Sequence, residues 1–248
     1  MTPNVPADYA LVTGASGSVG YAIAHALAGR GMGLLLTGQD PGKLDRAARE
    51  LAAAGTTVAT LAADLATDEG IRNLATQAAA RLPRLDVLVH AAGVIRLGNI
   101  EAAGWEDLDH QFRVNLRAPF LLTKALLPML KAARGQVLFV NSSAGLSGGA
   151  DNVGYAATKH ALRALAAGIR DRVNADGVRV ISVFPGRTAS PMQEAVHRFE
   201  GRPYDPARLL QPVDVAAVVV SALSVPRTAE VTDVMVRPMM KPSSGEGR

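Results

Sequence analysis

The chain has 248 residues, 48% of them hydrophobic and 19% charged, which is enough for one large α/β domain with a core of its own. It contains no cysteine, so disulfide frameworks, thiolate metal sites and cysteine nucleophiles are excluded. The formal net charge of +4 and the isoelectric point near 9.7 come from arginines scattered singly along a chain with few aromatic residues, a pattern that argues against nucleic-acid binding.

A strand, a glycine-rich turn and a helix open the chain in that order. Asp8–Thr13 is predicted to be the strand, and an alanine-rich helix is expected from Tyr21 to Gly29. Between them lies Gly14–Gly20, with the sequence GASGSVG. Such a turn lets backbone N–H groups and the helix N-terminus approach a pyrophosphate. The order therefore predicts a dinucleotide-binding site.

Strands and helices continue to alternate to the end of the chain. Further strands are expected at Gly33–Thr37, Val58–Leu61, Asp86–Val89, Gln136–Val140, Gly177–Phe184 and Val231–Val236. Further helices are expected at about 41–53, 67–81, 106–132, 155–175 and 212–223. This alternation predicts one domain over residues 1–248 with an α/β Rossmann fold, a doubly wound, seven-stranded parallel sheet with helices on both faces.

Two residues at strand exits admit either a functional or a structural role. Asp40 lies 20 positions beyond Gly20, about where an acidic residue could hold the ribose 2′-hydroxyl of NAD. Its place before Pro41 favours a helix N-cap instead. His90 follows the strand Asp86–Val89, and we expect it to be a hydrogen-bonded structural residue rather than a catalyst.

Two segments in the second half of the chain have less regular patterns. In the helix at 106–132, Pro119 and Pro128 are expected to cause kinks. Asn115 lies in the same helix and is expected to be either exposed or satisfied by a specific partner. Residues 187–211 carry three prolines and no clean periodicity. Because they follow the carboxyl end of a strand, they are a candidate substrate lid.

Three polar residues form a candidate catalytic group. Tyr155 and Lys159 are four residues apart, so on a helix they project from the same face. A phenol with a pKa of about 10 is a poor proton shuttle at neutral pH, but an adjacent ammonium group favours the phenolate. Ser142 follows the strand Gln136–Val140, at the edge where open parallel sheets bind ligands. Taken alone, these residues also fit an ordinary helix tyrosine and a serine that caps a turn.

Taken together, the chain resembles the short-chain dehydrogenase/reductase family from about Asp8 to Arg237. The matching residues, in order, are Thr13 to Gly20, Asp64, Leu65, Ala91, Ala92, Gly93, Asn115, Ser142, Tyr155, Lys159, Pro185 and Gly186. Each match is weak alone, but the ordered series is specific. The resemblance implies an oxidoreductase that transfers a hydride between a nicotinamide cofactor and a carbonyl or secondary alcohol.

The resemblance also implies a role for each of these residues. Tyr155 would be the catalytic acid and base, Lys159 would lower its pKa and hold the nicotinamide ribose, and Ser142 would orient the carbonyl. Asn115 would bind a water in a proton relay, while its main chain helps to bend the helix. No metal ligand is implied. The residues expected around the cofactor are Gly14, Ser16, Ser18, Val19, Gly20, Gly38, Gln39, Asp64, Leu65, Ala91, Ala92, Gly93, Tyr155, Lys159, Pro185, Gly186 and Thr188.

Three positions depart from the pattern of the family. Ser18 stands where relatives usually carry glycine or alanine, and its side chain would either crowd the pyrophosphate or bond to it. His90 replaces a usual asparagine. Ser190 stands where a threonine often contacts the nicotinamide amide, and Thr188 is a second candidate for that contact. None of these departures removes a catalytic group.

The exit of the second strand bears on the choice of cofactor. NAD-preferring relatives usually carry aspartate where this chain has Gly38, so the carboxylate that would repel a 2′-phosphate is missing. NADP-preferring relatives usually carry arginine at the next position, and Gln39 can hydrogen-bond a phosphate but brings no charge. Because the missing aspartate is the more telling of the two, we expect NADP(H) to be favoured over NAD(H).

The expected partner is a small-molecule alcohol or ketone, bound by residues 95–105 and 187–211. Arginines in and near these segments are expected to be solvated rather than to bind an anionic substrate. They are Arg96, Arg187, Arg198 and Arg202. Relatives usually pair through the Tyr155 helix and the long helix before it, so a homodimer or homotetramer is implied.

No apolar stretch reaches the roughly 18 residues of a membrane span, and the N-terminus lacks a signal-peptide pattern. We therefore expect a cytoplasmic protein with neither a membrane nor a nucleic-acid partner. Residues 241–248 are expected to be a disordered tail. Two alternatives to the oxidoreductase stay open: a non-catalytic dinucleotide-binding sensor or scaffold, and an epimerase or dehydratase on the same fold.

Overall fold

Seven strands pair in parallel in the order β3-β2-β1-β4-β5-β6-β7, in a computed structural model that describes residues 7–240. The strands are β1 (Tyr9–Thr13), β2 (Gly33–Gly38), β3 (Val58–Ala62), β4 (Val87–His90), β5 (Gln136–Val140), β6 (Arg179–Pro185) and β7 (Asp233–Val236). The chain runs outward from β1 through β2 to β3 and then returns to place β4 on the other side of β1. Ligands bind at such a reversal, at the carboxyl ends of the strands.

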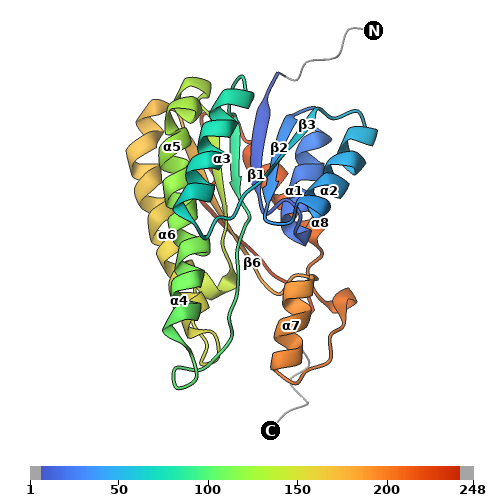
Figure 1. Ribbon diagram of the computed structural model, residues 1–248, viewed down its shortest axis with the longest axis vertical. Helices are drawn as coiled ribbons and strands as arrows, with labels where there is room; N and C mark the ends of the chain where they lie inside the picture. Colours follow the sequence, from blue (N-terminus) through green and yellow to red (C-terminus); the bar gives the residue numbers. More distant parts are fainter. Residues whose placement is uncertain (1–6, 241–248) are drawn as a thin grey trace.

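Helices cover both faces of this sheet (Figure 1), which confirms the predicted doubly wound fold. They are α1 (Ser18–Ala28), α2 (Pro41–Ala53), α3 (Asp68–Arg81), α4 (Trp105–Phe112), α5 (Ala118–Ala133), α6 (Val153–Val173), α7 (Pro191–Phe199) and α8 (Pro212–Leu223). Helices α1, α2 and α8 lie over one face, and α3, α5 and α6 over the other. Within residues 7–240, none of the helices is both long enough and apolar enough to cross a lipid bilayer.

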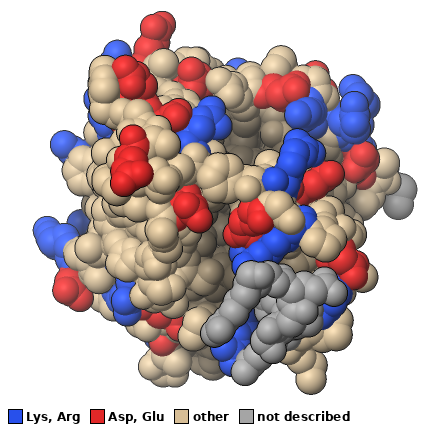
Figure 2. Space-filling view, turned by 90° about the horizontal axis from the view of Figure 1, so that it is seen from below, with Lys and Arg blue, Asp and Glu red and all other residues tan. Residues whose placement is uncertain are grey.

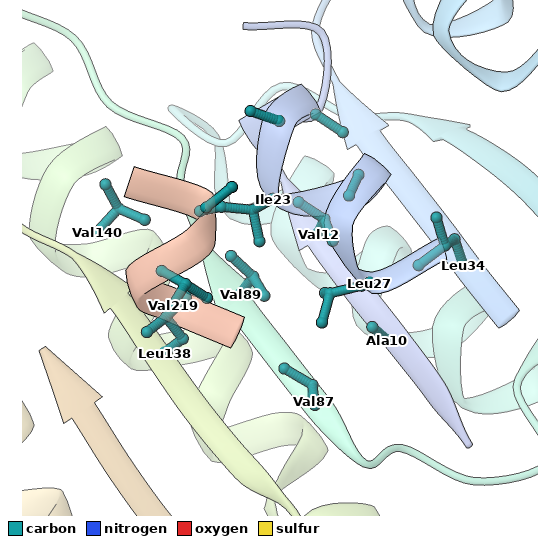
Figure 3. Close-up of a cluster of buried hydrophobic side chains, with 14 of the residues drawn as sticks. Ala10, Val12, Ile23, Leu27, Leu34, Val87, Val89, Leu138, Val140 and Val219 are labelled. Atoms are coloured by element: carbon teal, nitrogen blue, oxygen red, sulfur yellow. The ribbon is translucent and has the colours of Figure 1, made fainter. Parts of the chain in front are cut away.

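The core has two layers because successive strand residues point to opposite faces of the sheet. Val12 of β1 packs against Ile23 and Leu27 of α1 in the first layer, which Val219 of α8 completes (Figure 3). Its neighbour Leu11 belongs to the second layer, under α3, α5 and α6. Every residue of β2, β5 and β6 is buried, as expected for parallel strands covered on both sides.

The single helix predicted at 106–132 is wrong in its centre. The chain forms α4, a π-helical turn at Arg113–Arg117, and then α5, so the interruption falls at Asn115 rather than at a proline. Pro119 lies in the first turn of α5, where its missing N–H is not needed. Pro128 lies inside α5 without ending it. A π-helical turn widens the helix locally and often occurs at functional sites.

The segment at 187–211 is more regular than its composition indicated. It contains α7 and a short 3-10 helix at Pro206–Arg208. The ends of the segment are tied together because the Leu210 N–H donates to the Arg187 carbonyl oxygen at 3.0 Å and the Ala189 N–H donates to the Leu210 carbonyl oxygen at 2.8 Å. Helix α7 is therefore part of a loop that is closed at its base and lies beyond the carboxyl end of β6 (Figure 1). The expected tail at 241–248 lies outside the described residues.

Candidate active site

A cavity of about 920 Å³ opens at the carboxyl ends of the strands, between the glycine-rich turn after β1 and helix α7. It is lined by every residue that the sequence predicted for catalysis or cofactor binding except Asn115. Acidic and basic side chains are interspersed on the face seen from below in Figure 2 rather than gathered by sign. The strand order thus brings together predicted site residues that are up to 174 positions apart, from Gly14 to Thr188.

The glycine-rich turn is pressed against the exit of β4. Gly14 has a φ of +65°, and a Cβ atom there would lie 2.7 Å from the backbone of Ala92. A Cβ atom on Gly20 would lie 2.2 Å from the Gly14 carbonyl oxygen. The Thr13 hydroxyl oxygen fixes the same contact by accepting from the backbone N–H groups of Ala91 at 3.1 Å and Ala92 at 3.2 Å. Glycine is therefore required at both positions for the turn to close.

The exit of β2 forms the other wall at this end of the cavity. A Cβ atom on Gly38 would lie 2.8 Å from the Ser16 hydroxyl oxygen, so that hydroxyl occupies the space beside the glycine. Asp40 caps α2 by accepting from the Lys43 N–H at 3.1 Å, which confirms the N-cap interpretation. Lys43 also lines the cavity, and the sequence prediction missed it. A basic residue in the first turn of the helix after β2 was the available signal.

The candidate catalytic residues Tyr155 and Lys159 lie one turn apart on α6. The Lys159 Nζ is 5.8 Å from the centre of the Tyr155 ring and donates to the Val140 carbonyl oxygen at 3.0 Å. Burial lowers the pKa of Lys159 to about 8. Burial also raises the pKa of Tyr155, and a hydrogen bond with the Ser142 hydroxyl offsets part of that rise. The expected lowering of the phenol's pKa by the lysine is thus not seen in this geometry.

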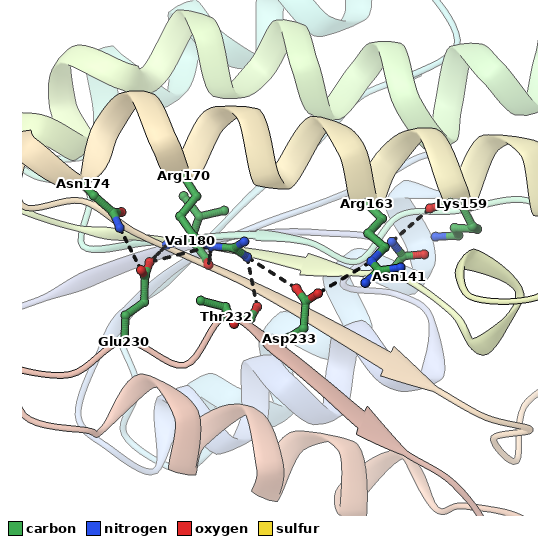
Figure 4. Close-up of polar contacts among 9 residues, drawn as sticks. All are labelled: Asn141, Lys159, Arg163, Arg170, Asn174, Val180, Glu230, Thr232 and Asp233. Carbon is green, nitrogen blue, oxygen red and sulfur yellow. Dashed lines mark hydrogen bonds and ion pairs between the residues drawn. The ribbon is translucent and has the colours of Figure 1, made fainter.

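Asn141 holds Ser142 and Lys159 in place, and the sequence prediction did not assign it a role. Its Nδ2 donates to the Lys159 carbonyl oxygen at 3.1 Å (Figure 4), and its Oδ1 accepts from the Ser142 N–H at 2.9 Å. The Ser142 hydroxyl oxygen in turn accepts from the Ala144 N–H at 3.1 Å. Ser142 therefore does cap a turn, yet its hydroxyl proton is left to donate. The structural and the catalytic interpretation are compatible.

The other end of α6 is fixed to the far strands of the sheet. Arg170 donates from Nε to the Val180 carbonyl oxygen on β6 at 2.9 Å, and from Nη2 to the Thr232 carbonyl oxygen at 3.1 Å. Figure 4 shows these contacts and the Asn141 contact along one side of the same helix. Because α6 is held at both ends, the phenol and ammonium groups near its N-terminus have a defined position relative to the sheet.

Asn115 is fully buried and has the specific partners that its place in a helix required. Its Oδ1 accepts from the Val94 N–H at 2.8 Å, and its Nδ2 donates to the Val94 carbonyl oxygen at 2.9 Å and to the Thr158 hydroxyl oxygen at 3.1 Å. A Cβ atom on Gly93 would lie 3.4 Å from Asn115 Oδ1 and 3.7 Å from Lys159 Nζ. Asn115 therefore joins the exit of β4 to α6, behind the wall of the cavity.

The structural interpretation of His90 is confirmed. The ring is 3% exposed and stacks on Phe139 with the ring centres 5.0 Å apart. Its Nε2 forms a hydrogen bond of 2.8 Å with the Thr123 hydroxyl group. Burial lowers the pKa of His90 to about 3, so the ring is neutral at physiological pH.

The exit of β6 carries Thr188 and Ser190, the two candidates for an amide contact. The Thr188 hydroxyl donates to the Gly186 carbonyl oxygen at 3.0 Å. Ser190 caps α7, because its hydroxyl oxygen accepts from the Gln193 N–H at 3.1 Å. Both residues line the cavity, and both hydroxyl groups are also engaged with the protein's own backbone.

Residues 8–201 match the family described as short chain dehydrogenase. The chain belongs to the short-chain dehydrogenase family. It is 34% identical over 221 residues to the 1-deoxy-11-beta-hydroxypentalenate dehydrogenase of Streptomyces exfoliatus, a match that covers 86% of this chain and 78% of that protein. The resemblance inferred from the motifs, and the oxidoreductase class with it, is thereby confirmed.

Solved structures agree with this assignment. One is an alcohol dehydrogenase from the archaeon Thermococcus sibiricus in complex with 5-hydroxy-NADP, which is 28% identical with a TM-score of 0.86, over 95% of this chain and 99% of that one. Another is a metagenomic short-chain oxidoreductase in complex with NADP, which is 32% identical with a TM-score of 0.81, over 95% and 99% of the two chains. A short-chain dehydrogenase of this fold binds a nicotinamide dinucleotide.

The departure at Ser18 is accommodated in this short-chain dehydrogenase. Ser18 is the first residue of α1, directly after Gly17, whose extended backbone (φ −91°, ψ 160°) forms the N-cap. It lines the cavity and is neither fully buried nor fully exposed. The backbone N–H groups of a first helical turn have no partner within the helix, so a hydroxyl side chain here adds a donor to the same end of the cavity.

Proposed function

We propose that this short-chain dehydrogenase interconverts a carbonyl compound and a secondary alcohol with NADP(H), using Tyr155 as the acid and base. The observation that carries the proposal is the shared cavity. Ser142, Tyr155 and Lys159 line it beside the exit of β5, and the glycine-rich turn lines its other end. A candidate proton-transfer group on α6 and a glycine-rich turn suited to a pyrophosphate thus line the same cavity.

The residues around the cavity fit a dinucleotide. The volume of about 920 Å³ lies within the range of cofactor sites, about 300–1,000 Å³. At Gly14 and Gly20 a side chain would collide with backbone, so the turn presents bare backbone, and α1 begins directly behind it. Backbone N–H groups and a helix N-terminus favour a bound pyrophosphate.

The side chains divide the work of the reaction. When bound, the nicotinamide supplies or accepts the hydride. The Ser142 hydroxyl donates to the substrate oxygen, and the Tyr155 phenol gives a proton to that oxygen in reduction or takes it in oxidation. Lys159 is buried with its Nζ against the Val140 carbonyl oxygen, and it is proposed to hold the ribose of the nicotinamide. Asn115, which lies behind the cavity wall, is proposed to hold a water molecule of the proton relay.

Preference for NADP(H) is supported by the exit of β2. Gly38 brings no carboxylate, and the Ser16 hydroxyl occupies the space where a side chain would begin. Lys43 supplies the cation that Gln39 lacks. Its Nζ is held only loosely, 3.8 Å from Asp40 and with 66% of the side chain exposed, so it is free to turn toward a phosphate. The solved relatives named above contain NADP compounds.

A homo-oligomer is proposed through α5 and α6. Large apolar side chains are exposed on and beside these helices, including Phe120 (45%), Leu108 (39%) and Val153 (38%). Burying such side chains between copies would remove apolar surface from water. Light scattering behind a sizing column would distinguish a dimer, a tetramer and a monomer. The cytoplasmic location and the single domain over 1–248 stay predictions.

The function is tested by titrating the purified protein with NADPH and NADH separately, followed by a panel of ketones and alcohols read at the nicotinamide absorbance. Tighter binding of NADPH and its consumption by a ketone would support the proposal. Failure of both cofactors to bind would overturn it. A Tyr155→Phe protein that kept its biological activity would favour a sensor or scaffold, and conversion of substrate without net redox change would favour an epimerase or dehydratase.

A further inference from the structure

Arg187 and Glu200 form an ion pair in the wall of the cavity, on the side of α7. Arg187 Nη1 donates to Glu200 Oε2 at 2.8 Å, and Nη2 donates to Oε1 at 2.6 Å. Arg187 is partly solvated, as expected, with 32% of its side chain exposed, but it is also paired with Glu200. A short, bidentate pair of this kind fixes the plane of the guanidinium group.

The backbone on both sides of the pair is also fixed. Arg187 directly follows Gly186 at the exit of β6, and its carbonyl oxygen accepts from the Leu210 N–H at 3.0 Å. Glu200 directly follows α7 as its C-cap, and its N–H donates to the Val196 carbonyl oxygen at 2.9 Å. The guanidinium group is therefore held between the end of β6 and the C-terminal end of α7. Pro185 and Gly186 line the same cavity as Tyr155.

The pair leaves one edge of the guanidinium group free. A guanidinium group has five N–H donors and can meet a carboxylate through its two terminal nitrogens or through Nε and one terminal nitrogen. Glu200 occupies only the first of these edges. Among residues 7–240, no acceptor is hydrogen-bonded to Arg187 Nε. The second edge therefore has no acceptor within the described part of the chain.

The local charge favours an anion at that edge. Arg202 Nη1 lies 3.9 Å from Glu200 Oε2, so the one carboxylate is shared by two arginines. The hydrogen bond from Arg187 lowers the pKa of Glu200, which keeps the pair ionised at neutral pH. Arg202 does not line the cavity and its side chain is 58% exposed, so it adds a positive charge beside the Arg187–Glu200 pair from outside the wall.

We propose that Arg187, oriented by Glu200, binds a carboxylate of the substrate, so that the enzyme acts on oxo acids and the corresponding hydroxy acids. The inference rests on the proposed function, since it names the substrate class of the same cavity. The carboxylate would lie at the free Nε edge of Arg187, and the carbonyl of the same molecule would reach Ser142 and Tyr155. The other acidic residues that line the cavity in the described part of the chain are Asp40, Asp64 and Asp151.

The test compares acids with neutral partners of the same shape. Linear oxo acids with the carbonyl at position 2, 3, 4 or 5 would each be assayed with NADPH against the corresponding methyl ester. For at least one chain length we expect the acid to have the higher kcat/KM. In Arg187→Gln the ratio of acid to ester should fall by about 10- to 100-fold, the scale of a charge-assisted bidentate contact.

Arg198→Gln is the matched control, because Arg198 belongs to α7, is 78% exposed, pairs with Glu194 and does not line the cavity. It should leave the ratio of acid to ester unchanged. If Arg187 only held α7 in place, Arg187→Gln would lower kcat/KM for acids and esters alike, and that result would overturn the proposal. A wild-type enzyme that reduced esters and acids equally well would also overturn it while leaving the proposed function intact.

A binding measurement covers the case in which no ketone of the series is reduced, an outcome that would count against the proposed function. Pentanoate and pentanamide would be titrated into the NADP⁺-loaded protein in a calorimeter. We expect pentanoate to bind more tightly, the difference to disappear in Arg187→Gln, and binding to weaken as salt is added. Equal binding of the two compounds by the wild-type protein would contradict the role of Arg187.

Discussion

Replacing Asn141 with alanine should weaken the fold and the catalytic site together. The side chain is 4% exposed and makes two hydrogen bonds, one to the Lys159 carbonyl oxygen and one from the Ser142 N–H. A buried hydrogen bond contributes about 0.5–1.5 kcal/mol net, so we expect the free energy of unfolding to fall by about 1–3 kcal/mol. Because the same bonds position Ser142 and Lys159, kcat/KM should fall by about 10- to 100-fold.

The assay is urea unfolding followed by circular dichroism, combined with steady-state kinetics under conditions where the variant is fully folded. Asn99→Ala is the matched control, since Asn99 is exposed and accepts only a local bond from the Ala102 N–H at 2.9 Å. The control should stay within about 0.5 kcal/mol of the wild type. If Asn141→Ala were as stable and as active as Asn99→Ala, the proposed link between β5 and α6 would be refuted.

Three further predictions concern single residues of the cavity. Tyr155→Phe should abolish turnover while NADPH affinity, measured by fluorescence, changes little, because the phenol's proposed role is proton transfer; near-normal turnover would remove that role. Lys159→Met should raise the free energy of unfolding by about 1–3 kcal/mol below pH 8, because burial holds the pKa of Lys159 at about 8 against an ordinary 10.5. The folded wild type carries the cost of a buried charge below pH 8, so the gain should shrink as pH rises to 10.5, and a gain independent of pH in urea unfolding would contradict the assignment. Gly38→Asp should raise the ratio of NADH to NADPH affinity by about tenfold or more, since Ser16 can rotate away from the new side chain and a carboxylate repels a 2′-phosphate; an unchanged ratio would exclude this wall from cofactor selection.

The positions of the candidate catalytic and cofactor residues could be predicted from the sequence because they follow from strand exits. Gly14, Gly93, Ser142 and Gly186 each come directly or closely after an apolar strand, and parallel strands of one sheet end at the same edge. The spacing of Tyr155 and Lys159 required only a helix. Local patterns therefore determined the fold and which residues face the cavity.

The family resemblance implied a bend at Asn115, but local patterns alone could not predict the break in the helix at 106–132, because its cause is not local. Prolines are the usual sign of a kink, but the π-helical turn at Arg113–Arg117 coincides with Asn115, whose partners Val94 and Thr158 lie 21 and 43 positions away. A propensity scale records Asn115 only as a mediocre helix residue. The hydrogen bonds that offset the low helix propensity of Asn115 depend on the tertiary arrangement, which brings the segment after β4 and helix α6 next to it.

The same reason explains why the sequence favoured a solvated Arg187. An arginine in a proline-rich segment with no periodicity is usually exposed, and nothing near it in the chain predicted otherwise. Its partner Glu200 lies 13 positions away, at the end of a helix that the composition did not indicate. Once Leu210 pairs with the Arg187 backbone, the segment closes and α7 brings the carboxylate to the guanidinium group. The proposed substrate selection thus depends on side-chain pairing across the candidate lid, whereas the proposed hydride-transfer chemistry depends mainly on residues at strand ends.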